Sequence, residues 1–328
     1  MSELRWHPVL REWVITATQR QDRTFLPPRD YCPLCPTKPG GFETEIPRPD
    51  FEIAVFENRF PSLRPNPPEP AIEPNGLFDV RPAQGECEVV VYTPQHDTTL
   101  AQQTTEHIHR LIQVWTHRYQ ELGALPYVEY VFIFENKGEV IGVTLHHPHG
   151  QIYAYPFVPP IAHRQLESAR LHLEGTGRCL HCDVLRLEAE DGRRVLLDDG
   201  QFAAVIPFYA RWPYEVHLVP KRHGGALPEL TGEETWSLAR ALKRVLVGYD
   251  RLFGFSMPYI LAMHQAPTDG QEHPYAHFHL ELYPPHRTAT KLKYLAGSET
   301  GMGTFINDSL PEEKAEELRG VLPGEEEI

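Results

Sequence analysis

Gly142-Val-Thr-Leu-His-His-Pro-His-Gly-Gln151 is the stretch around which the chain is organised, and it follows an apolar run, Val128-Glu-Tyr-Val-Phe-Ile-Phe134. The β-branched and aromatic residues of that run predict a strand. If the histidine stretch is also extended, alternate side chains share a face, so that His147, His149 and Gln151 point the same way. A neutral imidazole in such a pocket can bind a metal, transfer a proton or act as a nucleophile. The alternative is a histidine-rich surface hairpin, which the apolar residues on both sides disfavour.

Composition and charge exclude several classes of protein. Of the 328 residues, 41% are hydrophobic and 23% charged, which excludes long disorder, and no run is apolar enough to span a membrane. The first eight residues contain no apolar signal core, so we expect a cytoplasmic protein. The net charge of -14 argues against a nucleic-acid-binding protein, although it allows a local basic pocket for phosphate.

The order of predicted elements occurs twice along the chain. In the first half, a cysteine pair, a strand near 87–93, a helix from Leu100 to Leu122 and the strand at 128–134 precede the histidine stretch. After a proline-rich link at 156–160, the same order begins again. Three residues of the first half have counterparts 130 residues later. These are His147, His149 and Gln151, which correspond to His277, His279 and Glu281. The spacing predicts an internal duplication, with halves at residues 1–160 and 161–328.

Four of the five cysteines form two Cys-x-x-Cys pairs, each with histidines further along its half. Two thiolates and two imidazoles close a tetrahedral structural zinc site. The first predicted set is Cys32, Cys35, His96 and His147, and the second is Cys179, Cys182, His223 and His277. One alternative is that each pair is a free dithiol, or that only one site is occupied. Another is that His264, His279 and Glu281 form the second metal site instead, for iron or zinc.

The two halves differ at one chemically important position. If zinc holds His147, then His149 is presented rigidly to the pocket, which favours His149 as a nucleophile toward phosphorus. Gln151 can donate to a phosphoryl oxygen without competing for the proton. Glu281, its counterpart, would repel phosphate. We therefore expect only the first half to be catalytic.

Several motifs resemble those of the galactose-1-phosphate uridylyltransferase family, in the histidine-triad superfamily. They are His147-Pro-His-Gly-Gln151, Phe134-Glu-Asn-Lys-Gly138, Tyr283-Pro-Pro285 and Lys291-Leu-Lys-Tyr-Leu-Ala-Gly-Ser-Glu299. The resemblance covers nearly the whole chain, and glutamine at 151 is specific because hydrolases of the superfamily typically have histidine there. It implies an α+β fold of two histidine-triad-like halves, each an antiparallel sheet with flanking helices, assembled as a homodimer.

The reaction that this resemblance implies is a ping-pong transfer in galactose metabolism. His149 would attack the α-phosphorus of UDP-glucose, release glucose 1-phosphate and pass the uridylyl group to galactose 1-phosphate. Gln151 would hold a phosphoryl oxygen. Some family members have iron on three histidines and a glutamate in the second half, whereas the duplicated cysteine pairs here indicate zinc.

The resemblance also implies substrate contacts, for Arg20, Arg23, Asn58, Asn136, Thr144, Lys293 and Glu299. The arginines would meet phosphate, Asn58 would lie near the uridine, and Asn136 beside the phosphates. Thr144 stands where many members have serine. Lys293 and Glu299 would hold the hexose, from the partner subunit. A structural role is an equal alternative for Arg23 and Asn58.

Two other functions fit the same residues. One is a nucleotide-sugar phosphorylase or adenylyltransferase of the superfamily, acting on an ADP-sugar with inorganic phosphate. The other is a zinc-stabilised nucleotide-binding module without turnover, which would form no covalent intermediate. The glutamine expected shortly after Glu299 is missing, which leaves the sugar selectivity open.

Overall fold

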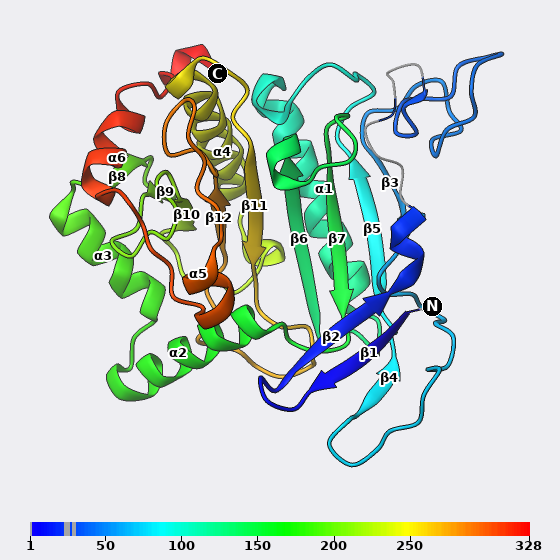
Figure 1. Ribbon diagram of the computed structural model, residues 1–328. Coiled ribbons are helices and arrows are strands. Elements are labelled where there is room, and N and C mark those ends of the chain that lie inside the picture. Colours follow the sequence, from blue (N-terminus) through cyan, green and yellow to red (C-terminus); the bar gives the residue numbers. More distant parts are fainter. Residues whose placement is uncertain (1, 23–26, 28–30) are drawn as a thin grey trace.

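The protein is described by a computed structural model that covers residues 2–22, 27 and 31–328. A nine-stranded sheet, antiparallel at every pairing, forms its centre (Figure 1). The strands are, in spatial order, β3 (Ala54–Glu57), β5 (Glu86–Val91), β7 (His149–Tyr155), β6 (Tyr130–Lys137), β11 (Tyr259–His264), β12 (His279–Tyr283), β10 (Val216–Pro220), β9 (Phe202–Val205) and β8 (Val195–Asp198).

The two halves of the chain meet in the middle of this sheet. The first four strands in the spatial order come from the first half and the other five from the second. At the junction, β6 pairs with β11, with Phe134 opposite Ala262 and Lys137 opposite Tyr259. The predicted α+β fold with antiparallel sheets is confirmed, and the structure adds that the two sheets are continuous. The pairing leaves neither β6 nor β11 as an exposed edge.

Two long helices cover one face of the sheet. They are α1 (Thr105–Gly123) and α4 (Gly232–Phe253), and their apolar stripes pack into the main core with buried residues of both halves. The predicted helix at 100–122 is divided, because Thr104 caps α1 by accepting a hydrogen bond from the His107 N–H. Leu100–Gln102 forms a separate 3₁₀ turn, η3.

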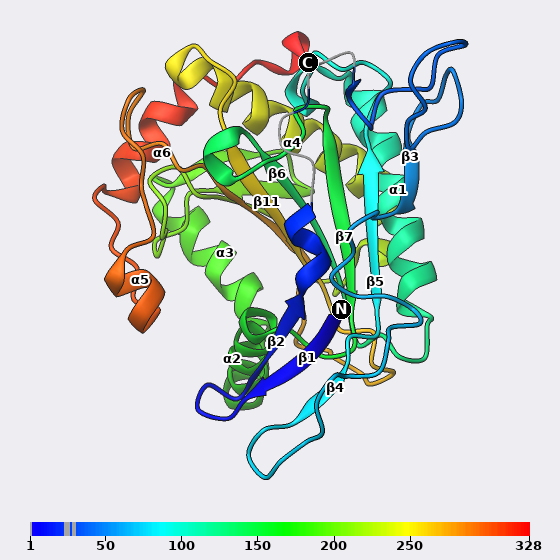
Figure 2. The ribbon, with the colours of Figure 1, turned by 45° about the vertical axis from the view of Figure 1, so that its right-hand side comes forward.

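The other face carries smaller elements (Figure 2). A three-stranded sheet of β2 (Glu12–Ala17), β1 (Ser2–His7) and β4 (Val80–Pro82) lies over β7, where Leu4 packs in one cluster with Tyr153. The second half contributes α2 (Pro160–Thr176), α3 (Leu180–Asp191) and α5 (Gly297–Met302) to this face, whereas α6 (Pro311–Arg319) packs beside α4, with Ala315 and Leu318 in the main core. Further 3₁₀ turns within the described residues are η1 (Thr18–Asp22), η4 (Glu139–Ile141), η5 (Leu227–Glu229) and η6 (Glu325–Glu327).

The element order repeats between the halves. The order β5, α1, β6, β7 in the first half matches β10, α4, β11, β12 in the second. The strand β7 begins at His149, and β12 begins at His279. Among the described residues, no helix has the length and apolar character that a membrane crossing requires.

Candidate active site and metal centres

The histidine stretch bends just before β7. His147 lies outside the strand, so the expectation that it shares one strand face with His149 and Gln151 is wrong. Pro148 explains the boundary, because a proline has no N–H to donate to a sheet. The ring of His147 is therefore free to turn toward the cysteine pair, while His149 and Gln151 remain on one face of β7.

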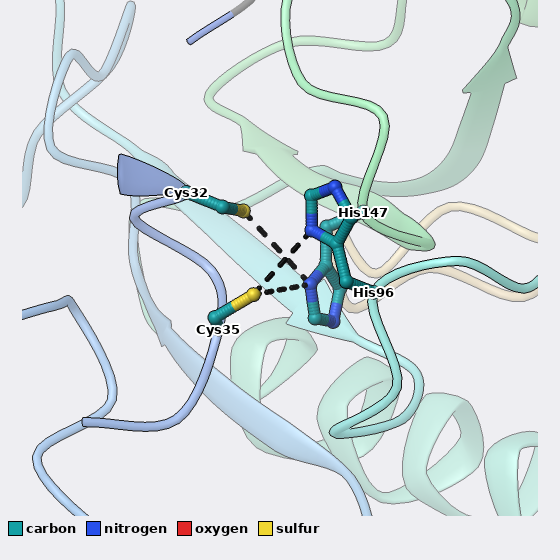
Figure 3. A group of neighbouring side chains, drawn as sticks. All are labelled: Cys32, Cys35, His96 and His147. Carbon is teal, nitrogen blue, oxygen red and sulfur yellow. Dashed lines mark hydrogen bonds between the residues drawn. The ribbon is translucent and has the colours of Figure 1, made fainter. Parts of the chain in front are cut away.

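The first cysteine and histidine set comes together at this bend (Figure 3). The Cys35 sulfur lies 3.4 Å from Nδ1 of His96 and 3.5 Å from Nδ1 of His147, and the Cys32 sulfur lies 3.9 Å from the latter. The four candidate ligand atoms are all within 4.8 Å of one another. Tetrahedral zinc bonds of about 2.3 Å to sulfur and about 2.0 Å to nitrogen would separate those atoms by about 3.5 Å, so the set fits such an ion.

A hydrogen bond fixes the tautomer of His147. Its Nε2–H donates to the carbonyl oxygen of Thr93 at 2.7 Å, so the Nδ1 lone pair faces the sulfurs. Burial lowers the pKa of His147 to about 4, which keeps the ring neutral. Both features suit a metal ligand.

The second cysteine and histidine set repeats this arrangement. Nδ1 of His277 lies 3.3 Å from the Cys179 sulfur and 3.6 Å from the Cys182 sulfur, and its Nε2–H donates to the carbonyl oxygen of Pro220 at 3.0 Å. With His223, the four ligand atoms are again within 4.8 Å of one another. Each half of the protein therefore has a cluster that can hold a metal ion.

His149 has the geometry of a neutral nucleophile. Its Nδ1–H donates to the carbonyl oxygen of His147 at 2.7 Å, which leaves the Nε2 lone pair without a proton. Burial lowers the pKa of His149, which favours the neutral ring. Phe134 pairs with Gln151 across β6 and β7, and continuing this register places Asn136 opposite His149.

A cavity of about 240 Å³ opens beside His149. Asn136 and Glu135 of β6 line it, together with Thr98, Thr99 and Ser256. Ser256 belongs to the second half of the chain. The cavity therefore contains side chains that sequence periodicity could not assign to it.

Gln151 is linked to two of the predicted substrate residues. Nδ2 of Asn58 donates to Oε1, the side-chain carbonyl oxygen of Gln151, at 3.1 Å. Arg20, in η1, donates to the hydroxyl of Tyr153 at 3.0 Å, and that hydroxyl lies 3.4 Å from the same carbonyl oxygen. Tyr153 was not predicted from the sequence, although its place two residues after Gln151 puts it on the same face of β7.

The other predicted substrate residues occupy different environments. Arg23 lies outside the described residues. Thr144 is half-buried in the bend before His147. Lys293 and Glu299 form a buried ion pair at 3.0 Å in the second half, and neither is among the described residues that line the His149 cavity. Within one chain, both side chains of this pair hydrogen-bond to the backbone of Ile306.

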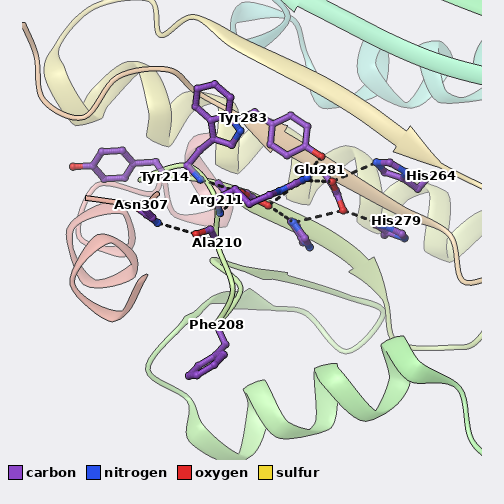
Figure 4. Close-up of polar contacts among 12 residues, drawn as sticks. Phe208, Ala210, Arg211, Tyr214, His264, His279, Glu281, Tyr283 and Asn307 are labelled. Carbon is purple, nitrogen blue, oxygen red and sulfur yellow. Dashed lines mark hydrogen bonds and ion pairs between the residues drawn. The ribbon is translucent and has the colours of Figure 1, made fainter. Parts of the chain in front are cut away.

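Glu281, the counterpart of Gln151, lies in a dense polar cluster (Figure 4). Its carboxylate is 3.0 Å from Arg211 and 3.4 Å from each of His264 and His279. Burial raises the pKa of Glu281, but His264 and His217 outweigh burial and hold that pKa well below its usual value. A carboxylate thus stands where the first half has a neutral amide.

Part of this cluster is a further candidate for a metal ion. The ligand atoms of His264, His279 and Glu281 lie within 4.8 Å of one another, as do those of Glu215, His217 and Glu281. Apart from the 3.4 Å contact with Glu281, neither ring nitrogen of His264 has a hydrogen-bond partner among the described residues. The nitrogen-and-oxygen set and the second cysteine set therefore both exist, where the sequence had presented them as alternatives.

Comparisons with known proteins agree with this geometry. Residues 1–159 match the family described as galactose-1-phosphate uridyl transferase, N-terminal domain, and residues 165–326 match its C-terminal domain. A galactose-1-phosphate uridylyltransferase of Thermotoga maritima is 41% identical, over 97% of this chain and 98% of its own.

Two solved structures are similar over nearly the whole chain. A uridylyltransferase superposes with a TM-score of 0.86 at 36% identity, covering 97% of this chain and 98% of its own. An ADP-glucose phosphorylase from Arabidopsis thaliana, with bound ADP-glucose, has a TM-score of 0.73 at 26% identity and covers 98% of this chain and 100% of its own. From its matches and from the site at the start of β7, the chain belongs to the galactose-1-phosphate uridylyltransferase family.

Proposed function

We propose that this enzyme transfers the uridylyl group of UDP-glucose to galactose 1-phosphate through a covalent intermediate on His149. The observation that supports this most directly is the hydrogen bond from Nδ1–H of His149 to the His147 carbonyl oxygen, because it leaves Nε2 as the free nucleophilic atom. Glutamine at 151, on the same strand face, supplies a neutral donor for the phosphoryl group.

Attack by Nε2 of His149 on phosphorus requires no general base, because this nitrogen carries no proton. Nε2 of His149 forms a bond to the α-phosphorus of UDP-glucose, and the bond from that phosphorus to the bridging oxygen breaks, which releases glucose 1-phosphate. The Nδ1 proton stays in place, so the uridylylated ring is a cation that the His147 carbonyl stabilises. A phosphate oxygen of galactose 1-phosphate then attacks the same phosphorus and displaces Nε2, giving UDP-galactose and neutral His149.

We further propose that zinc occupies both cysteine and histidine sets. The distances and the tautomers of His147 and His277 support this assignment. Bound zinc would supply rigidity, because it ties the segment of the cysteine pair to the bend before β7. Elemental analysis should give about two zinc per chain. One zinc and one iron would instead assign the second metal to His264, His279 and Glu281.

The remaining substrate roles are proposals of the same kind. Asn136 lines the His149 cavity, which supports a role beside the phosphates, and Thr144 precedes the same bend. For Lys293 and Glu299 we propose a homodimer in which their loop reaches the partner's cavity. Tyr294 and Leu295 support this, because 73% and 50% of their surfaces are exposed on that loop.

We propose that the chain divides into a catalytic half, residues 1–160, and a non-catalytic half, residues 161–328. The boundary falls at the start of α2. We expect the enzyme to act in the cytoplasm, since two sites built from cysteine and histidine ligands suit a reducing compartment.

Intact-mass measurement tests the proposed reaction. With UDP-glucose and no acceptor, the protein should gain the mass of one uridylyl group, and His149→Ala should abolish the gain. A gain from ADP-glucose but not from UDP-glucose would assign the chain to the ADP-sugar phosphorylases. No gain from either, in metal-loaded protein, would refute the covalent mechanism and leave a nucleotide-binding module.

A further inference from the structure

The side-chain amide of Gln151 is oriented by its neighbours, and the direction of each hydrogen bond can be followed from a fixed donor. The first chain of bonds begins at the backbone N–H of Phe60, which donates to Oδ1 of Asn58 at 2.9 Å. A backbone N–H cannot exchange donor and acceptor, so the amide of Asn58 has only one orientation that satisfies it. Nδ2 of Asn58 therefore faces Gln151 and donates to its carbonyl oxygen at 3.1 Å.

The second chain of bonds begins at Arg20, whose guanidinium can only donate. Its Nη1 donates to the hydroxyls of Tyr153 at 3.0 Å and Ser62 at 2.9 Å. Since the Tyr153 oxygen accepts from Arg20, its own proton is available for the Gln151 carbonyl oxygen, 3.4 Å away. Tyr153 is buried, with 8% of its surface exposed, so its hydroxyl has few alternatives in solvent.

Both chains end on the same atom of Gln151. A reversed amide would place the NH₂ group of Gln151 against the NH₂ group of Asn58, leaving two donors opposed. The NH₂ group of Gln151 is thus left to donate elsewhere. Among the described residues it donates to no protein atom, and it lies on the face of β7 that bears His149.

We propose that Asn58 and Tyr153 are positioning residues that hold the carbonyl oxygen of Gln151, so that its NH₂ group donates to the phosphoryl oxygen during uridylyl transfer. Arg20 acts through Tyr153 in this arrangement. The inference rests on the proposed function and changes the roles implied for two residues. Arg20 and Asn58 contribute by orienting Gln151, where the family resemblance had assigned them contacts with phosphate and uridine.

A double-variant cycle tests this inference. Single-turnover uridylylation by UDP-glucose is measured for Asn58→Ala, Tyr153→Phe and Gln151→Ala, and for each of the first two combined with Gln151→Ala. We expect Asn58→Ala and Tyr153→Phe each to slow the step about tenfold, the effect of one lost hydrogen bond, with the affinity for UDP-glucose unchanged. In the Gln151→Ala background, neither should slow the step further.

Tyr155→Phe is the matched control. It removes a hydroxyl from the same face of β7 without removing a bond to Gln151, and it should leave the rate unchanged. Losses that multiply in the double variants would overturn the inference, because Asn58 or Tyr153 would then act independently of Gln151.

A second measurement does not depend on turnover. The ¹⁵N side-chain amide resonance of Gln151, assigned by its loss in Gln151→Ala, should shift and exchange faster with solvent in Asn58→Ala and in Tyr153→Phe. An unchanged resonance in both variants would overturn the inference. If the wild-type protein forms no adduct, the proposed reaction fails, and the resonance still decides whether these residues orient Gln151.

Discussion

Replacing Glu135 with glutamine should remove a pH-dependent loss of stability from this enzyme. Glu135 lies on β6 next to the His149 cavity, with 3% of its surface exposed, and its carboxylate accepts a hydrogen bond from Tyr259 at 3.2 Å. Burial raises the pKa of Glu135 from its ordinary value of 4.5 to about 7, even though Lys137 and the tyrosines Tyr259 and Tyr92 oppose the rise.

The sign and size of the effect follow from this pKa. A carboxyl group whose pKa is raised by folding binds its proton more tightly in the folded state than in the unfolded state. Its contribution to stability is therefore complete below pH 4.5 and is lost as the pH rises through about 7. Each pKa unit corresponds to about 1.4 kcal/mol, so the free energy of unfolding should fall by about 3 kcal/mol across this range.

The assay is urea unfolding at a series of pH values for the wild type and Glu135→Gln. The difference between their free energies of unfolding should change by about 3 kcal/mol between pH 4.5 and pH 8. Contributions from histidines cancel in this difference. Glu272→Gln removes the same charge from an exposed position outside the cavity and controls for the loss of one charge. A Glu135→Gln difference that is constant with pH would refute the reasoning.

The remaining predictions concern the backbone of β7 and the metal centres. In Gly150→Ala, the new Cβ would lie 2.2 Å from the Tyr92 hydroxyl, so the free energy of unfolding should fall by about 1–3 kcal/mol, and Tyr92→Phe should partly restore it in urea unfolding. Full stability in the single variant would contradict the packing at this strand. Cys35→Ser and Cys182→Ser should each remove one metal ion per chain by elemental analysis, but only Cys35→Ser should slow uridylylation strongly, because His147 supplies the carbonyl that orients His149. Equal slowing in both would mean that the second centre also affects the chemistry.

Local sequence patterns predicted the helices and strands whose own apolar residues follow a regular spacing. The apolar stripe of α1 and the runs that form β6 and β11 are visible in the sequence, because burial imposes their periods. The helices α2 and α3 were missed. Ala162 and Ala169 are the only described residues buried in α2, so no long apolar stripe marks it.

The sequence predicted those parts of the candidate site that occur in both halves of the chain. The spacing of the histidines and cysteines allowed both metal sets to be assembled, since each half presents the same ligands in the same order. The bend at Pro148 was recognised only from the backbone of the structure. The hydrogen-bonded link from Arg20 to Gln151 was recognised only from the tertiary structure. Residues 133 positions apart in sequence, such as Arg20 and Tyr153, have no local pattern that pairs them.

The pairing of β6 with β11 also explains why the two halves cannot be separated without consequence. These strands are equivalent members of the duplicated order, and they pair antiparallel, as the same edge of two identical subunits would around a two-fold axis. A protein made of one half would expose that edge and would need a second copy to cover it. Gene fusion would convert such a contact between subunits into a permanent contact within one chain. The two equivalent positions can then differ, with Gln151 in one half and Glu281 in the other.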